Sequence, residues 1–271
     1  MNSIPQNQDT LQAIVISGMK CGSTWLSDIL ARHPEIRHCL FSVDYEQEKI
    51  CPVDLPPPGL KHKILVGRRN LKLNPKDPRI YARHNPDLKF LALIRHPIER
   101  AYSQFVHHVN KRSGKNRMVF PNAHGTRING KTVTYDFNAC LPPTAPILPS
   151  FVRKSFYFET FTQYFQCFPK ERFLVFPLEL FQKEPEACFQ KIFSFLGVSY
   201  RFDPSWIHQK VNEGKYRPHS WLDTLLFKKK VVIQPITLET QHQLAALYRQ
   251  DVLKMSEWLG LDLESLWNLK Y

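Results

Sequence analysis

Lys20, Ser23 and Thr24 lie in a short segment whose residue types could bind a phosphate group. The segment reads Gly-Met-Lys-Cys-Gly-Ser-Thr-Trp over residues 18–25. Its two glycines, Gly18 and Gly22, permit a tight turn of the backbone. An ammonium group, two hydroxyl groups and the N–H groups at a helix start are suitable donors for anionic oxygens. The chemistry indicated is the binding of a phosphate, with a lysine held beside it.

The residues on either side supply elements that would position this segment. The short apolar run 13–17 predicts a buried strand, and Leu26, Ile29 and Leu30 give one apolar face of a helix. The order differs from the usual nucleoside-triphosphate loop, in which lysine follows the second glycine and the next hydroxyl residue holds magnesium. Here Lys20 comes two residues before Gly22. A tight structural turn is the alternative interpretation.

A second segment offers another phosphate site. The apolar run 89–94 predicts a strand that ends at Arg95, and Pro97 suits the start of a helix. Near-helical spacing is seen for Ile98, Tyr102, Phe105 and Val109. Ser103 would then lie about two turns along the helix, where it could share one phosphate with Arg95. The alternative is an arginine at a sheet edge and a serine on a solvated helix face.

Both segments resemble parts of one family, the sulfotransferases that use 3′-phosphoadenosine-5′-phosphosulfate (PAPS). The Gly-x-Lys-x-Gly-Ser-Thr-Trp order resembles that family's 5′-phosphosulfate loop, and the arginine with a serine eight residues later resembles its 3′-phosphate site. The two motifs lie about 75 residues apart, in the family's order. The resemblance extends over roughly residues 13–218, including 151–168, 172–176 and 195–197.

The resemblance implies a role for each matching residue. Lys20 would stabilise the bridging oxygen as the sulfuryl group leaves, and Trp25 would stack on the adenine, unless it is a buried aromatic residue at the helix start. The segment 211–218 is similar to the last nucleotide-binding loop of the family, although a solvated turn is an equal alternative. The full set of donor-binding residues implied is Gly18, Lys20, Cys21, Gly22, Ser23, Thr24, Trp25, Arg95, Ser103, Lys215 and Arg217. PAPS would be the co-substrate and 3′-phosphoadenosine-5′-phosphate (PAP) the product, with no metal expected.

The general base is left open by the sequence. Asp44 is the nearest positional equivalent of the family's carboxylate, with Glu46, Glu48 and His38 as rivals, and each could be a surface charge. Arg68 stands where another family stretch commonly has an acid. A carboxylate base works best when burial raises its pKa towards neutrality.

Composition favours one large α/β domain. The 271 residues are 43% hydrophobic and 23% charged, which suits a sizeable core. Apolar runs near 13–17, 64–66, 89–94 and 173–176 alternate with helical stretches and predict a central parallel sheet flanked by helices. Its ligand should bind at the carboxyl ends of the strands. We expect a single sulfotransferase domain over 1–271, with a core over 13–218 and a C-terminal helical part over 219–271.

Other features bear on location and partners. The sequence has no long apolar run and no signal-peptide pattern at its start, so we expect a cytoplasmic protein that does not bind membranes. Its six cysteines are widely spaced and are interpreted as reduced thiols. The segment 111–150 is a candidate acceptor-binding lid or a plain insertion. Residues 237–259 predict an amphipathic helix, in a monomer or a homodimer.

The expected function is transfer of a sulfuryl group from PAPS to a hydroxyl or amine of a small-molecule metabolite, with guanidinium alkaloids as one candidate group. A saccharide is the alternative acceptor. The net charge of +13 suits an anionic donor, and no nucleic acid is expected beyond the donor nucleotide. Two other classes stay open: a P-loop kinase that uses ATP and magnesium, and a non-catalytic protein that binds anions.

Overall fold

Six strands form a central sheet in the order β3-β2-β4-β1-β5-β8. The computed structural model describes residues 10–53, 55–57, 61–70, 76–115, 126–129, 132–141, 148–206 and 230–270. The strands are β1 (Ala13–Ser17), β2 (Ile36–Asp44), β3 (Lys49–Val53), β4 (Ile64–Asn70), β5 (Lys89–Ile94) and β8 (Phe173–Pro177). All neighbouring pairs are parallel except β2 with β3. The predicted α/β fold with a mostly parallel central sheet is therefore confirmed.

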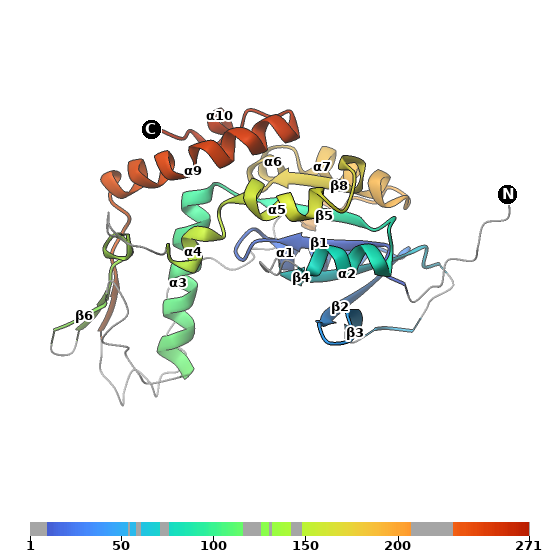
Figure 1. Ribbon diagram of the computed structural model, residues 1–271, viewed down its shortest axis with the longest axis horizontal. Helices are drawn as coiled ribbons and strands as arrows, with labels where there is room; N and C mark the ends of the chain where they lie inside the picture. The colour runs from blue at the N-terminus through green and yellow to red at the C-terminus, as the bar shows by residue number, and fades with distance from the viewer. Residues whose placement is uncertain are drawn as a thin grey trace. The chain divides into compact units, whose positions relative to one another are not determined.

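Helices cover both faces of this sheet (Figure 1). They are α1 (Ser23–Leu30), α2 (Asp77–His84), α5 (Tyr157–Phe165), α6 (Leu178–Lys183) and α7 (Pro185–Leu196), with short 3-10 turns at Lys170–Arg172 and Pro204–Trp206. On one face, the ring of Trp25 on α1 contacts Phe181 of α6 and Phe189 of α7. On the other face, Tyr81 of α2 and Tyr164 of α5 pack together. Aromatic side chains therefore fill both layers of the core.

The described chain divides into two compact units, and the sheet belongs to the first, Met1–Arg95 with Tyr157–Val211. The second, His96–Phe156 with Asn212–Tyr271, contains a three-stranded sheet in the order β6-β7-β9. Its elements are α3 (Pro97–Lys115), β6 (Thr126–Asn129), β7 (Thr132–Tyr135), η1 (Asn138–Cys140), α4 (Ser150–Arg153), β9 (Lys230–Ile233), α9 (Leu238–Leu259) and α10 (Leu263–Trp267). The helix predicted at the end of the chain is confirmed as α9. The predicted domain limits stay predictions.

The small sheet changes the interpretation of the segment 111–150. Its first residues belong to α3, and its described middle part forms β6 and β7. β7 then pairs in parallel with β9, about a hundred residues later in the chain, through the partners Val133 and Val231. The described part of this segment is thus a hairpin joined to a distant strand.

The β2–β3 hairpin is a second feature that we did not predict. β2 carries Arg37 and His38 near its start, and β3 contains Pro52, so neither has the apolar run of a buried strand. β2 is fixed partly by shape, because a Cβ on Gly67 of β4 would approach the Phe41 ring to 2.7 Å. Glycine at position 67 leaves the space that this ring occupies.

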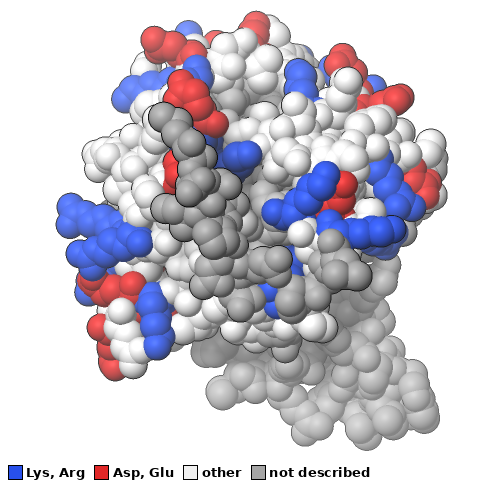
Figure 2. Space-filling model, turned by 90° about the vertical axis from the view of Figure 1, so that its right-hand side faces the viewer, with Lys and Arg blue, Asp and Glu red and all other residues white. Residues whose placement is uncertain are grey.

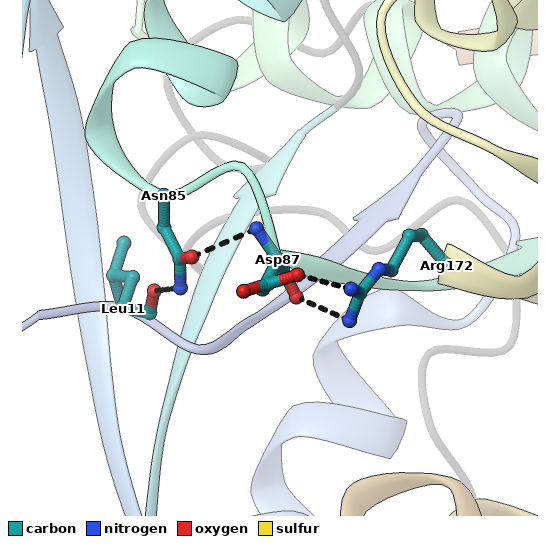
Figure 3. A network of polar contacts seen from close by, with 4 residues as sticks. All are labelled: Leu11, Asn85, Asp87 and Arg172. Atoms are coloured by element: carbon teal, nitrogen blue, oxygen red, sulfur yellow. Dashed lines mark hydrogen bonds and ion pairs between the residues drawn. The ribbon is translucent and has the colours of Figure 1, made fainter. Parts of the chain in front are cut away.

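The amino ends of three parallel strands are joined by polar contacts (Figure 3). The side chain of Asn85 donates to the Leu11 carbonyl at 2.9 Å and accepts from the Asp87 N–H at 2.9 Å. Arg172 donates to the Asp87 carbonyl at 3.1 Å and forms an ion pair with the Asp87 carboxylate. These residues precede β1, β5 and β8. The network therefore fixes the end of the sheet opposite to the glycine loop.

Charged side chains are spread over the surface drawn in Figure 2. On this face Lys and Arg form several separate groups with Asp and Glu beside them. The net charge of +13 does not produce one continuous basic patch there. Among the described helices, none combines the length and the low polarity that crossing a bilayer requires.

We predict that Asn85→Ala will destabilise the protein more than Arg172→Ala. Removing the Asn85 amide breaks two bonds to backbone groups and should cost about 1–3 kcal/mol. The Asp87 side chain is 71% exposed, so loss of its ion pair should cost less than about 1 kcal/mol. Urea denaturation of both variants measures this difference. If Arg172→Ala lowered the free energy of unfolding more than Asn85→Ala, the prediction that Asn85 contributes more to stability than Arg172 would be wrong.

Candidate functional site

The glycine loop joins β1 to α1 as the sequence predicted. The Cys21 N–H donates to the Gly18 carbonyl at 3.2 Å, which closes a turn, and the Leu26 N–H donates to the Gly22 carbonyl at 3.1 Å to begin the helix. Lys20 has a φ of 75° and Gly22 a φ of 90°. A positive φ is rare for a lysine, so this loop holds Lys20 in a special backbone conformation.

Gly22 is required at its position for two reasons. Its left-handed conformation disfavours any other residue type. A Cβ there would also come within 3.3 Å of Leu178 and 3.5 Å of Leu93. The loop is therefore pressed against the sheet and α6, with its backbone close to the end of β1.

The start of α1 is suited to an anion. The N-cap is Gly22, which makes no side-chain cap, and the first turn contains no acidic residue. Ser23 is buried and Thr24 is exposed within that turn. Backbone N–H groups and the helix dipole attract a negative group at such a position.

Lys20 and Arg95 interact electrostatically at this end of the sheet. Arg95 follows β5, which pairs with β1 through Ser17 and Leu93, so the two loops leave adjacent parallel strands in the same direction. Burial, and then the repulsion of the Arg95 guanidinium, lower the pKa of Lys20 below its ordinary value. Two cations that follow adjacent strands could both contribute to binding a multiply charged anion.

Tyr157 also belongs to this site, although the sequence gave no reason to select it. Its side chain is 2% exposed. The hydroxyl donates to the Arg95 carbonyl at 2.6 Å and accepts from the Arg95 N–H at 3.2 Å. The Cys21 sulfur lies 3.8 Å from the same hydroxyl. Tyr157 is one of many aromatic residues in its segment, and no local pattern distinguishes it from those that only fill the core.

Trp25 has the environment of a buried aromatic residue at a helix start. Its indole N–H donates to the Trp206 carbonyl at 3.1 Å, and its ring contacts Phe181 at a centroid distance of 5.4 Å. This packing agrees with the alternative that we gave for Trp25 and does not support stacking on an adenine.

Ser103 lies on α3 in the second compact unit and is partly exposed. The start of that helix is fixed by Arg100, which is fully buried. Arg100 donates to Ser155 at 2.6 Å and to Gln104 at 2.7 Å, and it also bonds the Phe151 carbonyl. A shared phosphate for Arg95 and Ser103 stays a prediction. Lys215 and Arg217 lie outside the described residues.

Three of the four candidate bases lie at the turn between β2 and β3. One oxygen of the Asp44 carboxylate accepts the N–H groups of Glu46 and Gln47, each at 3.0 Å. Glu46 is exposed, and Glu48 forms an ion pair with Arg83. The carboxylate of Asp44 therefore stabilises the turn, at the carboxyl end of a strand two positions away from β1.

His38, the fourth candidate, lies near the opposite end of the sheet. His38 pairs with Val66 of β4, and Val66 pairs with Ala13 at the start of β1. Ala13 lies about 13 Å along β1 from Ser17, the residue that ends this strand before the glycine loop. Its Nε2 is buried and has no hydrogen-bond partner in the described structure. Burial, and then the nearby Arg68, lower the pKa of His38 to about 4, against a smaller raising effect of Asp28. His38 is thus a neutral side chain in the sheet layer.

The described residues contain no group of three His, Cys, Asp or Glu side chains placed to hold a metal ion. None of the six cysteines, all within the described part of the chain, forms a disulfide.

The strand, glycine loop and helix, with a second cation at the end of the adjacent strand, are features typical of phosphate-binding sites. The family model described as the sulfotransferase domain matches residues 11–234. The chain belongs to the sulfotransferase family. No curated protein matches it by sequence.

Among solved structures, a bacterial sulfotransferase agrees with this assignment at the level of the fold. A sulfotransferase from Alicyclobacillus acidocaldarius aligns with a TM-score of 0.62 and 16% identity, over 94% of this chain and 98% of that one. Mouse sulfotransferase SULT7A1, complexed with PAP, aligns with a TM-score of 0.46 and 14% identity, over 94% of this chain and 88% of that one. The sulfotransferase domain from the curacin biosynthetic pathway aligns with a TM-score of 0.46 and 12% identity, over 95% of this chain and 100% of that one.

Gly22→Ala should lose nucleotide affinity, whereas Gly197→Ala should not. Both glycines have a positive φ, so both variants carry the strain of a left-handed alanine, about 1–2 kcal/mol. They differ in the space around the new Cβ, because nothing lies within 4 Å of a Cβ on Gly197. Only Gly22→Ala would also move the loop that bears Lys20. Calorimetric titration with PAP measures the difference, and equal affinities for the two variants would contradict the placement of the loop at the donor site.

We expect stability to fall as the pH is lowered from 6.5 to about 4, partly through His38. The folded pKa of His38 is about 4 and its ordinary value is 6.5, so in this range the unfolded chain binds a proton that the folded chain does not. This pKa shift corresponds to a decrease of up to about 3 kcal/mol in the free energy of unfolding. His38→Gln should reduce the dependence of unfolding free energy on pH. Some dependence should persist, because burial also lowers the pKa values of His33 and His84. If the free energy of unfolding depended on pH equally in His38→Gln and in wild type, the assignment of His38 as a neutral side chain in the folded protein would be wrong.

Proposed function

We propose that this protein transfers a sulfuryl group from PAPS to a hydroxyl or amine of a small-molecule acceptor and releases PAP. The observation that carries the proposal is the placement of Lys20 and Arg95 just after the adjacent parallel strands β1 and β5, beside the uncapped start of α1. PAPS has anionic groups at both its 5′ and 3′ positions, which suits two cations on adjacent strands. Membership of the family supports the reaction class.

The residues of the loop would perform distinct tasks. Ser23, Thr24 and the first N–H groups of α1 would hold the 5′-phosphate, and Lys20 would stabilise the bridging oxygen. As the bond from sulfur to this oxygen breaks, a bond forms from sulfur to the acceptor oxygen or nitrogen. The acceptor proton passes to a base, and the bridging oxygen leaves as part of the PAP phosphate. A fixed donor at a developing negative charge contributes about 10²–10³ in rate.

Arg95 would bind the 3′-phosphate, together with Ser103 and the predicted ligands Lys215 and Arg217. Stacking of Trp25 on the adenine stays a prediction, although its N–H donates to the Trp206 carbonyl and its ring contacts Phe181.

Among the candidate bases, the position of Asp44 fits best. It ends β2, so it lies at the carboxyl edge of the sheet, where ligands of such folds bind. His38 is near the other edge, and Glu48 is paired with Arg83. We therefore propose Asp44 as the first candidate for the acceptor proton.

The function predicts separate defects for Lys20→Ala and Arg95→Ala. Lys20→Ala should reduce turnover by about 10²–10³, since it removes the donor at the leaving oxygen. Arg95→Ala should weaken PAP binding more than tenfold, the range expected for loss of a charged hydrogen bond. Turnover is measured by PAP release with a panel of small-molecule and saccharide acceptors, and affinity by the thermal shift that bound ligand causes.

Exposed residues of the same unit provide controls, namely Lys191→Ala on α7 and Arg201→Ala. Both should behave as wild type. The titration is done with PAP in the presence of EDTA and, separately, with ATP plus magnesium. Metal-independent binding of PAP supports the proposal. Preference for ATP with magnesium would indicate a kinase, and PAP binding without turnover of any acceptor would indicate a non-catalytic anion-binding protein.

A further inference from the structure

One buried hydroxyl group contacts both segments of the candidate donor site. Tyr157 begins α5, far in sequence from Cys21 in the glycine loop and from Arg95 after β5. Its oxygen lies 2.6 Å from the Arg95 carbonyl oxygen, 3.2 Å from the Arg95 nitrogen and 3.8 Å from the Cys21 sulfur. All three residues belong to the same compact unit.

The direction of each contact follows from simple valence. A tyrosine hydroxyl has one proton to donate and two lone pairs that accept. The Arg95 carbonyl can only accept, so it takes the proton, and the Arg95 N–H can only donate. The Cys21 thiol is then the donor of the third contact. Tyr157 thus accepts from the loop and from the Arg95 N–H while it donates to the Arg95 carbonyl.

The position of Arg95 explains why such a contact matters. The sheet ladder between β5 and β8 ends at the pair Ile94 and Pro177, and proline has no N–H to offer. Arg95 is the next residue, beyond this ladder. Its N–H and carbonyl are bonded by the Tyr157 hydroxyl instead, which fixes the direction in which the arginine side chain leaves the strand.

We propose that Tyr157 is a positioning residue that holds Arg95 and the glycine loop in register for one ligand carrying phosphates at two positions. This inference rests on the proposed function. Tyr157 need not touch the ligand, because it acts through the backbone of Arg95 and the thiol of Cys21. Its loss should therefore affect a ligand with two phosphate groups more than a ligand with one.

The test is Tyr157→Phe, which keeps the ring and removes only the hydroxyl. PAP, which carries both the 3′- and the 5′-phosphate, should bind about tenfold more weakly than to wild type, the effect expected for loss of bonds to buried backbone groups. The affinity for AMP, which has the 5′-phosphate alone, should decrease by a clearly smaller factor. Both affinities are measured by calorimetry on protein shown to be folded by circular dichroism.

Tyr248→Phe is the matched control. Tyr248 is also fully buried, and its hydroxyl donates to a backbone carbonyl, that of Val152, at 3.1 Å. Its loss should lower the melting temperature to a similar extent and leave both affinities unchanged. A general loss of packing in Tyr157→Phe would instead lower the melting temperature with no selective effect on PAP.

Cys21 gives an independent check. Cys21→Ala removes the donor to the hydroxyl and should bind PAP more weakly than Cys21→Ser, which keeps a donor at this position. In the Tyr157→Phe background, Cys21→Ala should have no further effect, since the two changes remove the same contact.

The outcomes separate this inference from the function on which it rests. If wild type binds PAP and Tyr157→Phe binds PAP equally well, or loses PAP and AMP affinity by the same factor, Tyr157 is not a positioning residue although the donor site stands. Failure of wild type to bind PAP would overturn both.

Discussion

The candidate site depends on one constraint, which is that the cations Lys20 and Arg95 follow adjacent parallel strands. Folding brings two cations together at the end of adjacent strands, and burial removes part of the water that would separate their charges. The fold must hold them there through other contacts: the parallel pairing of β1 with β5, the packing of Gly22 on Leu93, and the buried Tyr157. In the proposed function, the anionic donor would offset the repulsion between these two charges, so that its binding would also stabilise the folded protein.

Parallel pairing explains why these charges meet although they are far apart in the chain. Ser17 and Leu93 are partners in the register of β1 and β5, so the residues that follow each strand emerge side by side. The helix that follows β1 then turns its first N–H groups towards the same region. A one-residue change in register would exchange the faces of a strand; between β2 and β4, the close fit of Phe41 over Gly67 helps to exclude such a change.

Much of this arrangement could be predicted from the sequence, because it rests on local patterns. The apolar runs predicted β1, β5 and β8, and periodicity with a suitable first residue predicted α1, α3 and α9. The hairpin of β2 and β3 was missed because β2 has neither a continuous apolar run nor a regular alternation and β3 contains a proline. The four-residue strands of the small sheet have too little pattern to detect. Tyr157 could not be found, because its hydroxyl acts on residues 62 and 136 positions away. The role of Asp44 in a turn likewise depends on backbone geometry that the residue type alone does not specify.

The contacts among Asn85, Asp87, Leu11 and Arg172 have a consequence for how such a protein can change. They fasten the strands at the end remote from the glycine loop, so rigidity and ligand recognition are supplied by different sets of residues. Reinforcing the amino-end contacts is therefore a way to raise the free energy of unfolding without changing any residue of the glycine loop.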